Sequence, residues 1–370
     1  MIARVWLGVT FVLTASQVWA VDFHRVAETG ITGGLAVVVG TDDPSSIDPL
    51  LRCPSFVIQY VDTHQPRLDR IARFLREKHL YGRATVARFD GTRLPYVDNL
   101  VNLLVVESGS VSLRDEEILR VLAPRGVAWI GDRKLVKAVP AGTGEWTHHM
   151  FDATGIGSGN DSTLRRPRSM QWQSRPEYSR SHENMSSVSA VVSAGGRIFS
   201  IVDEGPAASI YLPSDWQLVA RDAYSGVLLW KRSISSWHAR LFPLKSGPLQ
   251  LPRRLVTDGD HVYTTLDFDG PIHQLDAATG ETKAVFTETD HAEEILHVDG
   301  KIIAVVHTES AGAPYLGRLP SGFPTSLFAE QSVNLAGDRA VVVVDARSGR
   351  TLWKTSPGPF IPLTVAADHR

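Results

Sequence analysis

The feature that most constrains the fold is a short motif that occurs three times in the second half of the 370-residue chain. Each copy is an apolar run, then Asp-Ala, a variable residue, Ser or Thr, and Gly, then a second run. Aspartate can accept hydrogen bonds from the backbone N–H groups of a tight turn, and glycine supplies the positive φ of a hairpin. The motif therefore predicts three β-hairpins, with turns at 222–226, 276–280 and 345–349.

A second element of the repeat lies upstream of each copy. Glycine-containing turns at 195–196, 259–260 and 299–300 are each followed by an apolar run that is typical of a strand. Tryptophan ends the second run of the first and third copies, at Trp230 and Trp353. A buried indole removes a large apolar surface from water, so we expect these residues between neighbouring sheets. Two levels of repeat in the same order predict an all-β region from residue 186 onward.

The Asp-Ala-x-Ser/Thr-Gly turns and their tryptophans resemble the PQQ-like β-propeller repeat family. The resemblance covers about 170 residues and implies blades over 186–370, at least three of them, in a ring that is incomplete in this chain. Propellers usually have at least four blades. Blades beyond the given sequence, strands from before residue 186, or a second chain could complete the ring. The motif builds blades and does not itself indicate an activity.

Residues 31–140 have a different pattern, in which apolar runs alternate with amphipathic stretches. The runs at 35–39, 56–61, 84–89, 100–106 and 126–130 predict five strands. Helices are expected around 68–75, from the helical spacing of its apolar residues, and at 115–122, ending before Pro124. Strands joined by helices predict an α/β domain of the Rossmann-like type, with a parallel sheet between two helical layers.

Three segments of this domain resemble class I S-adenosylmethionine-dependent methyltransferases. Asp62 ends the second strand, the stretch Arg88–Asn99 contains Asp90 and Leu94-Pro95, and 119–126 reads Leu-Arg-Val-Leu-Ala-Pro-Arg-Gly. The resemblance implies a methyltransferase-type domain that binds S-adenosylmethionine through Gly40, Asp62 on the ribose and Asp90 on the adenine.

The chain departs from this family after the first strand. Val38 stands where the family has an acidic residue, and Asp42 and Pro44 follow Gly40 in place of further glycines. Bulk and negative charge there oppose close approach of a cofactor carboxylate. Asn102 also replaces an aspartate of the fourth strand. These departures predict a degenerate cofactor site.

Residues 141–185 are rich in Gly, Ser, Asn and Arg and predict a linker or an entry segment to the propeller. This segment contains His148, His182 and Glu183, which are residue types that ligate metals. A metal site on these three residues and a set of ordinary polar loop residues are the two open interpretations.

The N-terminus predicts export. Arg4, an apolar stretch from Val5 to Ala15, and Val18-Trp19-Ala20 are typical of a signal peptide over 1–20, cleaved after Ala20. The mature protein is then periplasmic or extracellular, without a transmembrane span. A net charge of −2 argues against a nucleic-acid partner.

The sequence thus favours an exported binding or assembly scaffold, whose propeller face engages a protein or saccharide partner and which has no firm cofactor. The alternative is an active S-adenosylmethionine-dependent methyltransferase with an accessory propeller. A third interpretation, a PQQ-dependent oxidoreductase with calcium, is disfavoured. The single cysteine, Cys53, excludes a vicinal disulfide, and no clear cluster of calcium ligands is evident.

Overall fold

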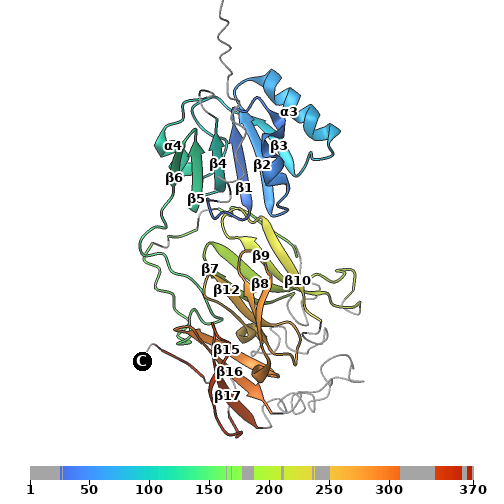
Figure 1. Cartoon of the computed structure of the whole chain (residues 1–370), viewed down its shortest axis with the longest axis vertical. Coiled ribbons are helices and arrows are strands. Elements are labelled where there is room, and N and C mark those ends of the chain that lie inside the picture. The colour runs from blue at the N-terminus through green and yellow to red at the C-terminus, as the bar shows by residue number, and fades with distance from the viewer. Residues whose placement is uncertain are drawn as a thin grey trace, which may run out of the picture.

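The computed structural model describes residues 26, 28–107, 109, 111–163, 165–167, 169–176, 187–209, 212–235, 237, 251–308, 338–360 and 365–368. The signal peptide predicted at 1–20 lies outside this part. Figure 1 shows an α/β unit followed along the chain by antiparallel sheets. No helix of the described part has the length and apolar character needed to cross a membrane.

The α/β unit contains one six-stranded sheet in the order β3-β2-β1-β4-β5-β6. Its elements are β1 (Gly34–Val39), η1 (Pro44–Ile47), α2 (Asp48–Leu51), β2 (Phe56–Asp62), α3 (Gln65–Glu77), β3 (Ala84–Arg88), β4 (Val101–Val106), α4 (Asp115–Val121), β5 (Leu122–Ile130) and β6 (Arg133–Val136). Strands β1 to β5 are parallel, and β6 is antiparallel to β5. The chain runs outward from β1 to β3 and then returns to β4, which is the doubly wound, Rossmann-like topology.

Both faces of this sheet are covered. Ala36 and Val38 of β1 share one apolar cluster with Leu50 of α2 and with residues of α3. The alternate residues of β1 share a second cluster with α4. Because side chains alternate across a strand, the apolar run of β1 is buried on both sides, as the sequence predicted for a parallel strand. The three-layer arrangement is confirmed.

The end of α4 differs from the prediction. We expected Pro124 to separate a helix from a strand at 126–130, but β5 begins at Leu122, directly after the helix. Leu122 is already extended and pairs with Val101, and the pairing register then shifts before Leu103. This irregularity accommodates the segment around Pro124 within the strand. The short strand β6, which has four residues, was not predicted.

The described residues after 186 form three four-stranded antiparallel sheets, each a simple meander. The first sheet holds β7 (Val188–Ala194), β8 (Arg197–Asp203), β9 (Trp216–Asp222) and β10 (Leu228–Ser233). The second holds β11 (Leu255–Thr257), β12 (His261–Thr265), β13 (Ile272–Asp276) and β14 (Thr282–Phe286), and the third holds β15 (Ala292–Val298), β16 (Lys301–His307), β17 (Arg339–Asp345) and β18 (Thr351–Lys354). The 3-10 helices η2 (Leu251–Arg254) and η3 (Thr287–Thr289) flank the second sheet.

The predicted repeat matches these sheets in detail. The motif turns, which we call the first, second and third turns (222–226, 276–280 and 345–349), join the last two strands of each sheet. In each turn Oδ1 of the aspartate accepts N–H groups of the following residues: Asp222 from Tyr224 and Ser225, Asp276 from Ala278 and Thr279, Asp345 from Ser348. The motif glycines have φ of 70°, 74° and 71°. The three copies of the repeat therefore form three separate open sheets in the part described.

The sheets pack against one another through apolar faces. One buried cluster contains Phe199 and Trp230 of the first sheet together with Val262 and Leu275 of the second. Another joins the second sheet to the third. These interfaces bury the apolar faces of the sheets against one another.

Residues 146–148, which we call the strap, tie the three sheets together at one edge. The strap contacts one residue of each sheet, and this residue lies two positions before the first hairpin turn of its sheet. Trp146 exchanges backbone hydrogen bonds with Ser193, the Thr147 carbonyl accepts from Thr257 N–H at 3.0 Å, and His148 Nε2 accepts from His297 N–H at 3.1 Å. The predicted linker thus acts as a structural clasp for the repeats.

The α/β unit is fastened to the first sheet by a buried hydrogen bond. Asn102 Nδ2 donates to Asp222 Oδ2 at 2.7 Å, while Asn102 Oδ1 accepts from Leu35 N–H. Ser55 Oγ donates to the Leu229 carbonyl nearby. Asn102, which the sequence analysis noted only as a departure from the methyltransferase pattern, therefore joins the two parts of the chain.

We expect Asn102→Asp to lower the free energy of unfolding by about 2–3 kcal/mol. The buried Asp222 carboxylate then loses its hydrogen-bond donor and faces a second carboxylate at position 102. Chemical denaturation at neutral pH measures this loss. The double variant Asn102→Asp/Asp222→Asn exchanges donor and acceptor and should recover most of it. An Asn102→Asp protein as stable as the parent would contradict the role of this bond.

Candidate functional site

The carboxyl edge of the Rossmann-like sheet is the place where the topology predicts ligand binding. The strand order reverses between β1 and β4, and such a switch point leaves a crevice beyond the strand ends. Gly40 follows β1 with φ of 77°, and its N–H donates to the Val61 carbonyl of β2. Phe89 N–H donates to the Asp62 carbonyl, which places the residues after β3 beside the end of β2. The sheet thus brings Gly40, Asp62 and Asp90, the residues named for cofactor binding, to one edge.

The Asp62 side chain is buried and is paired with other residues of the chain. Its side chain is 2% exposed, its Oδ1 accepts from His64 N–H at 2.8 Å, and its Oδ2 pairs with Arg67 Nη1 at 2.7 Å. His64 precedes α3 and Arg67 lies in the first turn of that helix, so the start of α3 covers the carboxylate. A ribose could reach Asp62 only after Arg67 moved away.

Arg67 is held from a second side. Its Nε pairs with Asp42 Oδ1 at 2.8 Å, so one guanidinium bridges the segment after β1 and the last residue of β2. Its hydrogen bond to Asp62 is the main factor that raises the pKa of Arg67, and Asp42 adds to the effect. Sequence reasoning named Asp42 as an obstacle to cofactor binding but missed Arg67, whose position five residues after Asp62 on a helix start was the available signal.

The loop after β1 has a fixed form of its own. Asp43 caps η1 by accepting from Ser45 N–H, and Tyr60 Oη donates to the Pro44 carbonyl at 2.7 Å. Burial raises the pKa of Glu107, which follows β4 and accepts a hydrogen bond from Thr41. Glu107 is a second residue of this edge that sequence reasoning did not identify.

Asp90 lies at the same edge but is exposed and shapes a turn. Its Oδ1 accepts from Thr92 N–H at 2.7 Å and from Arg93 N–H at 2.8 Å. These bonds lower the pKa of Asp90. The residue predicted to contact adenine thus holds its own loop.

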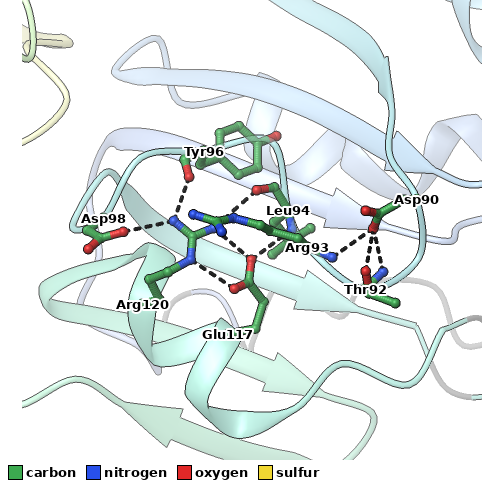
Figure 2. A network of polar contacts seen from close by, with 8 residues as sticks. All are labelled: Asp90, Thr92, Arg93, Leu94, Tyr96, Asp98, Glu117 and Arg120. Atoms are coloured by element: carbon green, nitrogen blue, oxygen red, sulfur yellow. Dashed lines mark hydrogen bonds and ion pairs between the residues drawn. The ribbon is translucent and has the colours of Figure 1, made fainter.

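Figure 2 shows how this loop is attached to α4. Arg120 Nη1 donates to the Tyr96 carbonyl and to Asp98, and Glu117 Oε1 accepts from Leu94 N–H at 2.8 Å. Arg120 and Glu117 also pair with each other, which lowers the pKa of Glu117. The segments 88–99 and 119–126, which both resemble methyltransferases, therefore contact one another beside this edge.

As they stand, the residues of this edge do not fit S-adenosylmethionine. The ribose acceptor is buried under Arg67, the segment after Gly40 is a capped turn in place of a glycine-rich one, and Asp90 is committed to its turn. Among the described residues of this edge, both carboxylate oxygens of Asp62 are paired within the chain, and Asp90 stays exposed.

The metal site predicted on His148, His182 and Glu183 is described only at His148. Only His148 of its three residues is described, because His182 and Glu183 lie outside the described residues. His148 is 5% exposed, its Nε2 accepts from His297 N–H, and its Nδ1 is 2.8 Å from Thr147 Oγ1. Both ring nitrogens serve the strap, so His148 lacks a lone pair for a metal. The described part of the chain contains no group of three or more metal-ligating residues in suitable positions.

A cleft of about 230 Å³ opens beside the strap, between the second and third sheets. Its polar lining includes Asp152, Asp258, His297 and Asp299. Asp258 Oδ2 accepts from Tyr263 Oη at 2.9 Å and lies 3.8 Å from His297 Nε2. The Tyr263 and His297 rings stack with centroids 5.0 Å apart. Sequence reasoning did not find this cluster, since its members belong to three separate segments.

No protein-family model and no curated protein matches the chain. Solved structures match its α/β part. A protein of Methanococcus maripaludis described as an S-adenosyl-L-methionine-dependent methyltransferase is 21% identical with a TM-score of 0.28, covering 31% of this chain and 55% of that one. A SAM-dependent methyltransferase from Aquifex aeolicus is 16% identical with a TM-score of 0.26, covering 31% and 65%. The chain spans about half the length of the solved structures it matches.

Proposed function

We propose that this chain is an exported binding or assembly scaffold, in which a methyltransferase-like α/β unit with a closed cofactor edge is fused to PQQ-like propeller blades. The observation that carries the proposal is the buried Asp42–Arg67–Asp62 bridge. A carboxylate that is already paired and desolvated gains little from a ribose hydroxyl, and exposing it would break two short ion pairs.

The fastening of the two parts supports the same role. Asn102 and Ser55 attach the opposite, amino-terminal edge of the Rossmann-like sheet to the first blade, and the strap ties the three blades together. A unit with this many fixed contacts is suited to presenting surfaces at constant positions. We assign recognition of a protein or saccharide partner to the blade region, where the acidic cleft offers carboxylates and hydroxyls as acceptors and donors.

Calorimetric titration with S-adenosylmethionine tests the closed edge. We expect no saturable heat from the parent chain with ligand up to about 1 mM, equivalent to binding weaker than about 4 kcal/mol. Arg67→Met, which uncovers Asp62, and Asp62→Asn serve as matched variants. Micromolar binding by the parent that Asp62→Asn weakens would overturn the proposal.

Active S-adenosylmethionine-dependent methyl transfer is the second candidate, and the sheet itself favours it. The switch point lies between β1 and β4, with Gly40 and Asp62 beside it. In that case Asp62 would release Arg67 when cofactor binds and accept the ribose hydroxyls. The same titration separates the candidates, because only methyl transfer requires the parent chain to bind S-adenosylmethionine.

A further inference from the structure

The strap is attached to the first and second sheets through backbone groups alone. Trp146 exchanges two backbone hydrogen bonds with Ser193 of the first sheet. The Thr147 carbonyl accepts from Thr257 N–H of the second sheet at 3.0 Å. Peptide groups keep their protons throughout the ordinary pH range, so these two attachments do not themselves respond to pH.

The attachment to the third sheet is different, because its acceptor is an imidazole. His148 Nε2 accepts from His297 N–H at 3.1 Å, and His148 Nδ1 lies 2.8 Å from Thr147 Oγ1. Thr147 Oγ1 donates its own proton to the Phe151 carbonyl, so it accepts from Nδ1–H. A neutral imidazole has one acceptor nitrogen, whereas an imidazolium has two donors and no acceptor. Protonation of His148 therefore replaces this hydrogen bond with two opposed N–H groups.

Every element packed against His148 brings a charged or titratable group to it. They are His149 and Asp152 of the loop that follows the strap, Arg253 of η2, Asp258 of the turn between β11 and β12, His297 of β15 and Asp299 of the turn between β15 and β16. Three of the six are carboxylates. An imidazolium formed here therefore has anionic partners close by.

The balance of these groups keeps the ring neutral at neutral pH. Burial is the main factor that lowers the pKa of His148 to about 4, the neighbouring His297 adds to the effect, and Asp152 opposes it. Burial also lowers the pKa of His297, against the attraction of Asp258 and Asp299. Acid charges the two facing rings together, and each then has a carboxylate on the side away from the other's hydrogen bond, namely Asp152 for His148 and Asp258 for His297.

We propose that acid detaches the strap from the third sheet and leaves it attached to the first and second, so that the strap responds to pH at one end only. Thr147, His148 and Asp152 line the cleft between the second and third sheets together with His297 and Asp299. A strap that leaves His297 widens this cleft. The apolar cluster that joins the second sheet to the third gains no proton between pH 7 and 4, so it holds the sheets together.

Hydrogen exchange of individual amides in the full chain tests the proposal, because each attachment has its own reporter. The reporters are His297 N–H for the third sheet, Thr257 N–H for the second and Ser193 N–H for the first. Protection is the intrinsic exchange rate at each pH divided by the measured rate. From pH 7 to pH 4 the protection of the His297 amide should fall about 100-fold, as a pKa of His148 lowered from 6.5 to about 4 implies.

The other amides separate local release from unfolding. Protection at Thr257 and Ser193 should change by less than about threefold, or half a pKa unit. Amides of the paired strands β16 and β17 should also keep their protection. Loss of protection at all of these amides together, or no loss at His297, would overturn the proposal.

His148→Gln is the matched variant, since glutamine keeps a carbonyl acceptor and cannot be charged. Its His297 amide should stay protected at pH 4. His261→Gln removes a different imidazole, one that pairs with Asp258, and should respond to acid as the parent does. The same acid response in His148→Gln as in the parent would contradict the assignment to this ring. The proposal does not depend on either candidate function, and none of these outcomes bears on the S-adenosylmethionine titration, so the two proposals fail separately.

Discussion

Replacing Gly280 with alanine is expected to lower the free energy of unfolding by about 2–5 kcal/mol. Alanine at φ of 74° is strained by about 1–2 kcal/mol, and the new Cβ would be 2.6 Å from the Trp230 ring, which adds about 1–3 kcal/mol of overpacking. Urea denaturation followed by tryptophan fluorescence measures the loss, and Trp230 itself reports on the displaced ring.

Gly349→Ala is the matched control for this prediction. Its φ of 71° imposes the same backbone strain, but no atom of the described residues lies within 4 Å of its Cβ position. We therefore expect a loss of only about 1–2 kcal/mol. Equal losses in the two variants would show that the Trp230 ring contributes nothing to the requirement for glycine at position 280.

Acidification from pH 7 to pH 4 is expected to remove about 3 kcal/mol of stability through His148 alone. Burial, with a smaller effect of His297, lowers the pKa of His148 from 6.5 to about 4. The neutral ring is the form that accepts from His297 N–H. The unfolded chain therefore binds a proton at higher pH than the folded chain, so this contribution is complete above pH 6.5 and is lost as the pH falls toward 4.

His148→Gln keeps an acceptor for the strap but removes the titration. The unfolding free energies of this variant and of the parent should differ most in their dependence on pH between 6.5 and 4. His79→Asn, at an exposed site with positive φ, should leave the pH profile unchanged. A His148→Gln profile that parallels the parent would show that the strap histidine is not the group that titrates.

The sequence alone was sufficient to predict strands β1 to β4 and the three motif turns. The apolar run of β1 and the three Asp-Ala-x-Ser/Thr-Gly turns lie where the pattern placed them, because each depends on hydrogen bonds and side-chain alternation among residues close in the chain. The prediction was wrong where a tertiary contact overrode local preference. Pairing of Leu122 with Val101 extends β5 across Pro124, although that proline reads as a helix stop.

The candidate site was predictable only in outline. Gly40, Asp62 and Asp90 reach one edge because parallel strands end on the same side of a sheet. What each side chain does there could not be read from spacing. Arg67 neutralises Asp62 because Asp42, 25 residues earlier in the chain, holds the guanidinium in place.

The three-fold repeat was thus determined by the sequence, since local turn chemistry specifies each hairpin independently of its neighbours. Only the tertiary structure decided what joins the repeats. His148 meets His297 across 149 residues of sequence, and Asn102 meets Asp222 across 120. Such partners are brought together by the packing of whole sheets. His148, which the sequence named as a metal ligand, therefore holds the strap to the third sheet. The position held by Trp230 in the first sheet is Ala284 in the second and the exposed Trp353 in the third, and packing alone decides which of these side chains is buried between sheets.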